Sequence, residues 1–207
     1  MSSSTPPPVP PTTAPPPAGY PEANPNKVLL VIDAQVGMLS DPPRGIPNSR
    51  KIAENIGTIL ETARAAPHPP LIVHIRNCGE PGEDDERGSA GWALLHAPPP
   101  HEPVIDKLKN NAFAGTSLGD IVKADAHIIV VGCQSDFCIR ATCNAAIARG
   151  NEIILIHGAH GTYDRVEVLA GGGVTPAKTV EREIEVELDE AGVHLLEMDD
   201  VNDLFND

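Results

Sequence analysis

The chain has 207 residues, which suits one domain with a single buried core. Its 15 Lys and Arg residues against 29 Asp and Glu residues give a formal net charge of −14, which repels nucleic-acid phosphates and anionic membrane surfaces. No apolar run is long enough to span a bilayer, and the four cysteines form no CxxC pair. We therefore predict a cytoplasmic protein with no nucleic-acid or membrane partner.

The first 26 residues differ in composition from the rest of the chain. Ten prolines lie between Pro6 and Pro25, mixed with Ser, Thr and Ala. Such a segment cannot bury a core, so we predict an extended tail over residues 1–26 and a folded domain over residues 27–207. A linker role is the simpler interpretation, and docking of the tail into a proline-binding groove is the alternative.

From Lys27 onward, short apolar runs typical of buried strands alternate with amphipathic helical patterns. The alternation predicts a three-layer α/β fold, a parallel sheet with helices on both faces. The connection over residues 76–103 exceeds ordinary loop lengths and is predicted to act as a lid or an interface element. The expected strands are 28–33, 71–75, 104–106, 128–131, 153–156 and 193–196, and the expected helices are 52–63, 117–123, 138–150 and 177–191.

Cys138 is the candidate nucleophile. It follows an apolar run that ends at Val131 and begins a helical pattern, where the positive end of the peptide dipoles is expected to lower the thiol pKa. Asp33 and Lys107 stand at the ends of two other expected strands. Ligands of open α/β sheets bind beyond the carboxyl ends of the strands, so an acid, a cation and a thiol are expected to converge there.

Three segments together resemble the isochorismatase-like cysteine hydrolase superfamily, which includes nicotinamidases and N-carbamoylsarcosine amidases. The segments are Val31-Ile32-Asp33-Ala34-Gln35, the stretch from Lys107 to Leu118, and the stretch from Gly132 to Thr142. The resemblance implies a six-stranded sheet in the order 3-2-1-4-5-6 and assembly as a homodimer or homotetramer.

The resemblance also assigns roles to residues. Asp33 is expected to act as general base and later as general acid, and Lys107 to favour the thiolate and orient the substrate. Cys138 is expected to attack a carbonyl carbon while the backbone N–H groups of Gln134 and Cys138 hold the oxyanion, next to a cis peptide at Cys133–Gln134. The implied reaction hydrolyses a C–N bond of a small amide or ureido substrate through a thioester and releases ammonia or an amine.

Several alternatives stay open at this stage. Lys109 competes with Lys107, because the two side chains share a face if both lie in a strand. The same motifs would suit a vinyl ether hydrolase of the isochorismatase type, although Cys138 argues against it, or a non-catalytic binding protein. The candidate substrate-pocket residues are equally compatible with core or interface packing; they are Gln35, Trp92, Phe113 and Tyr163.

The sequence predicts no catalytic metal and no cofactor. Nicotinamidases of the superfamily hold a metal with an Asp-x-His pattern after the first strand, whereas the stretch from Ser40 to Gly45 contains no histidine. Two smaller departures from the superfamily pattern concern Ser135, where Thr is commoner, and His160, which lies in a segment that often reads Asp-Ala near the rim of the site. The second departure leaves the substrate contacts open.

Overall fold

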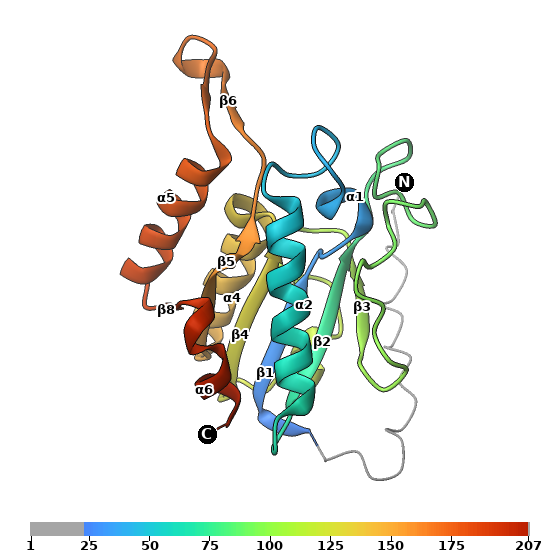
Figure 1. Cartoon of the computed structure of the whole chain (residues 1–207), viewed down its shortest axis with the longest axis vertical. Coiled ribbons are helices and arrows are strands. Elements are labelled where there is room, and N and C mark those ends of the chain that lie inside the picture. The colour runs from blue at the N-terminus through green and yellow to red at the C-terminus, as the bar shows by residue number, and fades with distance from the viewer. Residues whose placement is uncertain (1–22, 207) are drawn as a thin grey trace, which may run out of the picture.

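The computed structural model describes residues 23–206 and contains a central sheet of six parallel strands in the order β3-β2-β1-β4-β5-β8 (Figure 1). The predicted α/β fold and strand order are confirmed, and the sixth strand in chain order within this sheet is β8. The strands are β1 (Asn24–Ile32), β2 (Pro70–Asn77), β3 (Val104–Lys107), β4 (His127–Cys133), β5 (Glu152–Gly161) and β8 (His194–Leu196).

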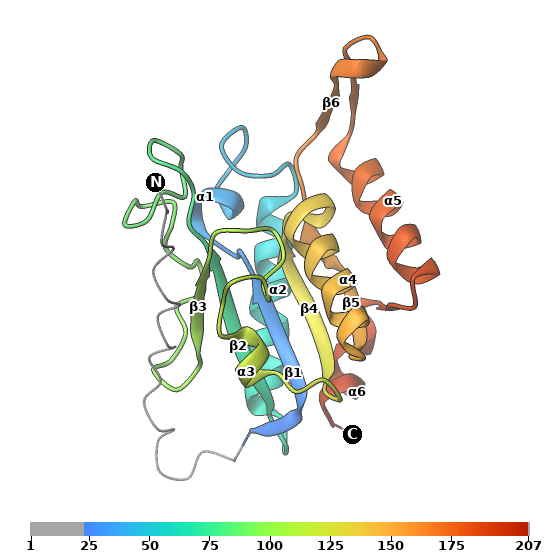
Figure 2. The same cartoon turned by 180° about the vertical axis from the view of Figure 1, so that it is seen from behind.

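Helices cover both faces of the sheet (Figures 1 and 2). One face packs against α2 and α6, and the other against α3, α4 and α5. In β1, Val28, Leu30 and Ile32 belong to one core and Leu29 and Val31 to the other, as the two-residue period of a strand requires. The helices are α1 (Val36–Leu39), α2 (Ser49–Ala65), α3 (Leu118–Ile121), α4 (Arg140–Arg149), α5 (Ala177–Glu190) and α6 (Val201–Asn206), with short helical turns η1 (Ser135–Ile139), η2 (Val168–Ala170) and η3 (Met198–Asp200).

The boundaries differ from the expected ones at a few places. Strand β1 begins at Asn24, before the expected start at residue 28, so only residues 1–22 of the predicted tail lie outside the described part of the chain. Strand β5 continues to Gly161, beyond the expected end at residue 156. Its second half has a shifted register against β4, and glycines and histidines there break the apolar pattern.

A hairpin that the sequence patterns do not predict follows β5. It consists of β6 (Arg165–Glu167) and β7 (Gly173–Thr175), which pair antiparallel and stand out from the body of the molecule above α5 (Figure 1). The hairpin exposes Val166, Val168, Leu169 and Val174. Short exposed strands of this kind lack a buried face and therefore leave little periodic signal.

Within residues 23–206, none of the helices combines the length and the apolar character required to cross a membrane.

Candidate active site

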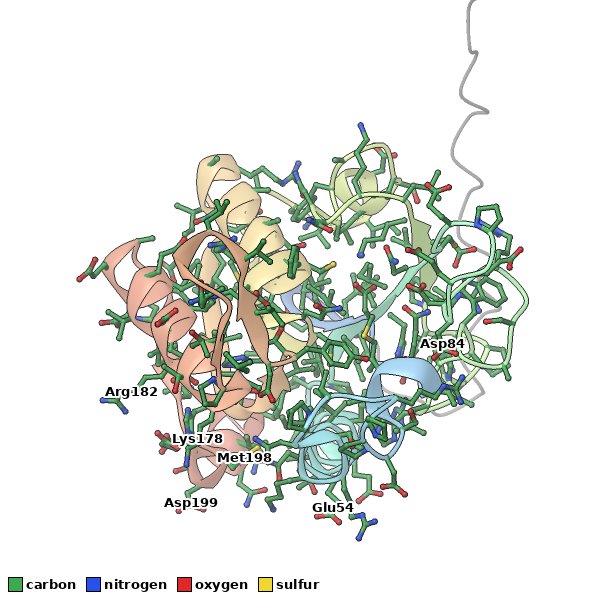
Figure 3. The ribbon with its side chains drawn as sticks, turned by 90° about the horizontal axis from the view of Figure 1, so that it is seen from above. Glu54, Asp84, Lys178, Arg182, Met198 and Asp199 are labelled. Atoms are coloured by element: carbon green, nitrogen blue, oxygen red, sulfur yellow. The ribbon has the colours of Figure 1, made fainter. Side chains whose placement is uncertain are left out.

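The ends of four adjacent strands bring the candidate residues together at one edge of the sheet. Asp33 follows β1, Asn77 is the last residue of β2, Lys107 is the last residue of β3, and Cys138 lies in the turn after β4. Figure 3 looks onto this edge, with Asp84 of the β2–β3 connection at one side and α5 at the other. The carboxyl ends of parallel strands meet at one edge, and the strand order reverses between β1 and β4, which is the usual place for a ligand site.

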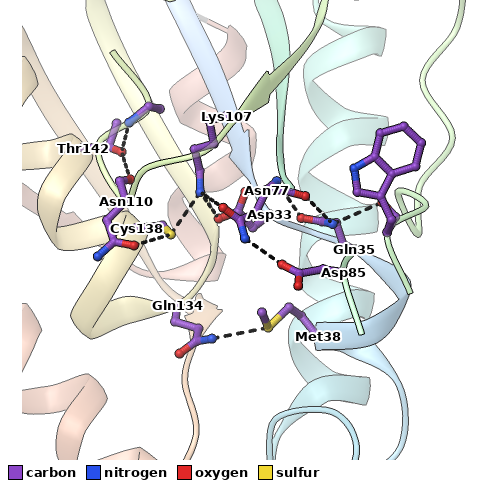
Figure 4. A network of polar contacts seen from close by, with 12 residues as sticks. Asp33, Gln35, Met38, Asn77, Asp85, Lys107, Asn110, Gln134, Cys138 and Thr142 are labelled. Carbon is purple, nitrogen blue, oxygen red and sulfur yellow. Dashed lines mark hydrogen bonds and ion pairs between the residues drawn. The ribbon is translucent and has the colours of Figure 1, made fainter. Parts of the chain in front are cut away.

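The Lys107 ammonium lies between the predicted base and the predicted nucleophile (Figure 4). Its Nζ is 2.7 Å from Asp33 Oδ2 and 3.1 Å from Cys138 Sγ. Asp33 and Lys107 are each 1% exposed and Cys138 is 7% exposed. Neither oxygen of Asp33 has a partner with good hydrogen-bond geometry within residues 23–206, so the Asp33–Lys107 contact is an ion pair that leaves lone pairs free to accept a proton.

The choice between the two candidate lysines is decided by where β3 ends. The strand stops at Lys107, so the alternation of side chains does not continue to Lys109, which lies exposed in the following turn. Asn110, three residues after the end of the strand, places Oδ1 3.8 Å from Cys138 Sγ, which is a long contact for a thiol donor.

Burial decides the protonation of the thiol, and the expectation of a lowered pKa is wrong. Desolvation and the Asp33 carboxylate raise the pKa of Cys138 to about 12, and the Lys107 ammonium only partly opposes them. Desolvation likewise raises the pKa of Asp33, although Lys107 acts in the opposite direction. Burial disfavours the charged form of Lys107, but Asp33 and Cys138 outweigh it and raise the Lys107 pKa. Cys138 is therefore a neutral thiol at rest.

The local helix geometry also differs from the expected α-helix start. Cys138 lies in a π-helical turn, η1, in which the Ile139 N–H donates to the Gln134 carbonyl at 3.1 Å, and α4 begins only at Arg140. The peptide bond between Cys133 and Gln134 is cis, at the position that the resemblance implies. The oxyanion role of the Gln134 and Cys138 amides stays a prediction.

The end of β5 anchors this turn through two side-chain hydrogen bonds. Ser135 Oγ lies 2.8 Å from His160 Nδ1, and Thr162 Oγ1 donates to Asp136 Oδ1 at 2.6 Å. His160 is 2% exposed, so it supports the turn from within the protein and does not stand at the rim of the site as the sequence comparison suggested.

Two glutamates of α5 support the same contacts from behind. Glu185 Oε1 lies 3.1 Å from His160 Nε2, and Glu181 Oε1 accepts a hydrogen bond from the Thr162 N–H at 3.2 Å. Burial raises the pKa of Glu181. Burial has the same tendency at Glu185, but hydrogen bonds from His160 and His157 outweigh it and lower the Glu185 pKa. Helix α5 thus positions the nucleophile turn indirectly.

Gln35 has a structural role that leaves it unavailable as a pocket residue. It is fully buried, its Oε1 accepts from the Asn77 N–H, and its Nε2 donates to the carbonyls of Asn77 and Trp92. The Trp92 ring is covered by the Arg76 guanidinium at 3.4 Å, and its Nε1–H donates to Cys78 Sγ at 3.3 Å. Packing therefore accounts for both Gln35 and Trp92.

The other two pocket candidates are half-buried. Phe113 packs against the core, and the Arg149 guanidinium lies 4.6 Å from the centre of its ring. Tyr163 donates its hydroxyl hydrogen to the Arg44 carbonyl at 2.8 Å, and burial raises its pKa. A substrate contact by Phe113 or Tyr163 stays a prediction.

Two polar residues of the site were missed by the sequence analysis. Asn77 Oδ1 accepts a hydrogen bond from Lys107 Nζ at 3.1 Å, and Asn77 Nδ2 donates to Asp85 Oδ2 at 2.6 Å. The place of Asn77 at the end of a strand is a signal that could have found it. No comparable signal marks Asp85, which lies inside the long β2–β3 connection.

The segment after β1 does not fit a metal site of the nicotinamidase kind. Its only carboxylate between residues 40 and 45 belongs to Asp41, which is exposed and pairs with Arg50 at 3.2 Å. Across residues 23–206, no three or more His, Cys, Asp or Glu side chains are grouped so that they could hold a metal ion. The absence of a metal and a cofactor from the reaction stays a prediction.

Comparison with known proteins agrees with this geometry. The model of the isochorismatase domain matches residues 27–171, which is most of the chain. The chain belongs to the isochorismatase family. Its relatives include two streptothricin hydrolases from Streptomyces noursei, 38% and 35% identical over 146 and 143 residues. These matches cover 68% and 67% of the isochorismatase-family chain but 56% and 50% of the relatives, so the chain spans about half of their length.

A solved structure supports the fold of this isochorismatase-family chain. It is the cysteine hydrolase from Pseudomonas syringae pv. phaseolicola 1448A, with a TM-score of 0.75 and 21% sequence identity. The match covers 87% of this chain and 92% of that chain.

Proposed function

We propose that this isochorismatase-family protein is a cysteine amidohydrolase that cleaves a C–N bond of a small amide or ureido substrate. The observation that carries the proposal is the Lys107 ammonium within 2.7 Å of the Asp33 carboxylate and 3.1 Å of the Cys138 sulfur. A carboxylate that can accept a proton, a cation that stabilises the resulting thiolate, and the thiol itself are the parts that nucleophilic acyl transfer requires.

The first half-reaction begins with the neutral thiol. Asp33 takes the Cys138 proton as sulfur attacks the carbonyl carbon. The negative charge passes from the carboxylate to the sulfur and then to the carbonyl oxygen of the substrate, and Lys107 stabilises it on the sulfur. Burial raises the pKa of Asp33, which makes its carboxylate a stronger base than a free one. Burial also raises the pKa of Cys138, which opposes the transfer, so the Lys107 ammonium is needed to stabilise the thiolate as it forms. The tetrahedral oxyanion is held by the amides of Gln134 and Cys138, and protonated Asp33 then gives its proton to the departing nitrogen.

The second half-reaction releases the acid. Asp33, ionised again, takes a proton from a water molecule that attacks the thioester carbon, and the C–S bond breaks. The sulfur recovers its proton from Asp33, so the resting state is restored with one water consumed and ammonia or an amine released. Two relatives are named for hydrolysis of streptothricin, which makes streptothricin a reasonable member of the substrate panel.

The test is a screen for release of ammonia or amine from simple amides, ureides, carbamoyl compounds and streptothricin. We expect Cys138→Ala to reduce turnover of the best substrate by at least about 10³-fold, since the covalent route is lost. Cys143→Ala is the matched control, because Cys143 is also a buried thiol of the same core, but burial alone raises its pKa and the site carboxylate and ammonium have no part in it.

Persistent turnover in Cys138→Ala would show that the thiol is not the nucleophile. Cleavage of isochorismate without release of ammonia or amine from any member of the panel would favour a vinyl ether hydrolase instead. Wild-type activity in Cys143→Ala together with loss in Cys138→Ala supports the proposal.

A further inference from the structure

The Lys107 ammonium is held by three acceptors. Its Nζ lies 2.7 Å from Asp33 Oδ2, 3.1 Å from Cys138 Sγ and 3.1 Å from Asn77 Oδ1. An ammonium can only donate. This one donates to Cys138 Sγ and to Asn77 Oδ1 and forms an ion pair with the Asp33 carboxylate, and Asp33 and Cys138 are the two groups that exchange the proton. Asn77 is the remaining acceptor, and it does not itself take part in the proposed reaction. Its place determines where the cation sits between the base and the nucleophile.

The orientation of the Asn77 amide is determined by the chemistry of its two neighbours (Figure 4). Lys107 can only donate, so the carbonyl oxygen must face it; the Asp85 carboxylate can only accept, so the NH₂ must face Asp85. The Nδ2 to Asp85 Oδ2 distance is 2.6 Å, a short hydrogen bond to a charged acceptor. If the amide rotated by half a turn, it would present a donor to the Lys107 donors and an acceptor to the Asp85 acceptors.

The backbone of Asn77 leaves the side chain little freedom other than this rotation. Gln35 accepts from the Asn77 N–H at 2.8 Å and donates to the Asn77 carbonyl at 3.1 Å. The main chain is therefore held on both sides by a fully buried side chain. The hydrogen bond to Asp85 therefore determines which end of the Asn77 amide faces the Lys107 ammonium.

Asp85 comes from the β2–β3 connection and is itself nearly buried, with 9% of its surface exposed. Its carbonyl accepts from the Gly79 N–H at 3.0 Å, which closes a turn of that connection beside the end of β2. The neighbouring Asp84 forms an exposed ion pair with Arg44 at 2.6 Å, beyond α1. The connection thus delivers one carboxylate to the interior while its neighbour contacts another segment at the surface.

We propose that Asp85, acting through Asn77, is a positioning residue that keeps the Asn77 carbonyl on the Lys107 ammonium and so keeps the ammonium between Asp33 and Cys138. This inference rests on the proposed function and extends it to a specific segment, because it makes the long connection part of the machinery that activates the thiol. A cation displaced by about 1 Å is expected to cost about 10²-fold in rate.

The test exchanges the two side chains. Asn77→Asp places two carboxylates opposite each other with no donor between them, and we expect kcat to fall about 10²-fold with little change in KM. The double variant Asn77→Asp with Asp85→Asn restores a donor and an acceptor and still offers an oxygen to Lys107. We expect it to recover at least about tenfold over Asn77→Asp alone. Asp84→Ala is the control for disturbance of the connection and is expected to stay within about threefold of wild type.

A second readout needs no substrate. The rate at which iodoacetamide alkylates Cys138, followed by mass spectrometry, reports the ammonium's stabilisation of the thiolate. We expect Asn77→Asp and Asp85→Ala to slow this reaction, and the exchanged pair to restore it. Thermal unfolding of each variant shows whether it is folded, and the exchanged pair keeps the test decisive if Asp85→Ala does not fold.

The outcomes separate this inference from the proposed function. If the exchanged pair is no faster than Asn77→Asp in turnover and in alkylation, or if folded Asp85→Ala alkylates at the wild-type rate, Asp85 does not position the cation. Turnover that survives in Cys138→Ala would instead overturn the proposed function, whatever the exchange shows.

Discussion

At the scale of single residues, the chemistry of the site depends on whether Asp33 or Cys138 carries the proton that the two groups exchange. Asp33 and Cys138 are both buried beside a Lys107 ammonium whose own pKa is raised by its two neighbours. Only one of the two acids needs to be ionised to balance that cation, and the raised pKa of Cys138, about 12, leaves the charge on Asp33 at rest. The carboxylate is therefore the base that the attack requires.

The first prediction concerns the pH dependence of activity. Desolvation raises the pKa of Asp33 above its ordinary value of 3.8, and protonated Asp33 cannot take the thiol proton. We expect kcat/KM on the best substrate to fall as pH decreases through this raised pKa, so that the acid limb lies above pH 3.8. A steady-state pH profile measures it, with circular dichroism to show that the fold persists. An acid limb at or below 3.8 would contradict the proposed role of burial.

At the scale of elements, the nucleophile turn depends on how closely β4 approaches β1. Gly132, one residue before the cis peptide, has φ 123°, and a Cβ placed there would lie 1.8 Å from the Ile32 carbonyl oxygen. The clashing oxygen belongs to the backbone of β1, which cannot move away without breaking the pairing of Ile32 with Gly132. Glycine is required at this position because both the dihedral angle and the space exclude a side chain.

The second prediction follows from this crowding. We expect Gly132→Ala to lower the free energy of unfolding by about 4 kcal/mol or more, or to prevent folding. The control is Gly115→Ala: Gly115 also has a positive φ, 74°, but has open space around its Cβ position, so the expected cost is only about 1–2 kcal/mol. Urea denaturation of the two variants gives the comparison. Equal losses would show that the dihedral angle, and not the contact with Ile32, limits this position.

At the scale of the whole molecule, Glu102 fastens the long connection to the body of the domain. Its carboxylate accepts hydrogen bonds from Arg64 of α2 at 2.7 Å and 2.8 Å, and lies 2.7 Å from His74 Nε2 of β2. Burial acts to raise the pKa of Glu102, but these hydrogen bonds outweigh it and lower the pKa. The connection that carries Asp85 is thus attached at its far end to a helix and to the sheet.

The third prediction concerns the stability that Glu102 contributes. Because its pKa in the folded state lies below the ordinary value of 4.5, the contribution is fully present above pH 4.5 and is lost as pH falls through the lowered pKa. We expect Glu102→Gln to lose about 2 kcal/mol at pH 7, with a smaller difference from wild type below pH 4. Urea denaturation of wild type and Glu102→Gln, at pH 7 and again below pH 4, measures the difference in the free energy of unfolding. A difference that does not change with pH would mean that packing, and not charge, accounts for the loss.

Much of the site could be predicted from particular residues. Asp33, Lys107 and the Gly132 to Thr142 segment each follow an apolar run, and parallel strands bring their ends to one edge. The roles of these residues, the homo-oligomeric state and the absence of a metal came from resemblance and stay predictions. Lys109 could not be separated from Lys107 until the end of β3 was known, because strand ends carry little signal of their own.

The sequence by itself determined the layered fold and indicated that Asp33, Cys138 and one of two lysines meet, because buried strands and amphipathic helices leave periodic patterns that depend only on neighbours along the chain. Only the tertiary structure decided the protonation of Cys138 and the partnership of Asn77 with Asp85. Burial depends on everything that packs around a group, and the path of a long connection is set by contacts such as those of Gln35 and Glu102 with distant segments. The protonation of Cys138 and the pairing of Asn77 with Asp85 therefore leave no pattern among neighbouring residues in the sequence, and only the folded structure shows them.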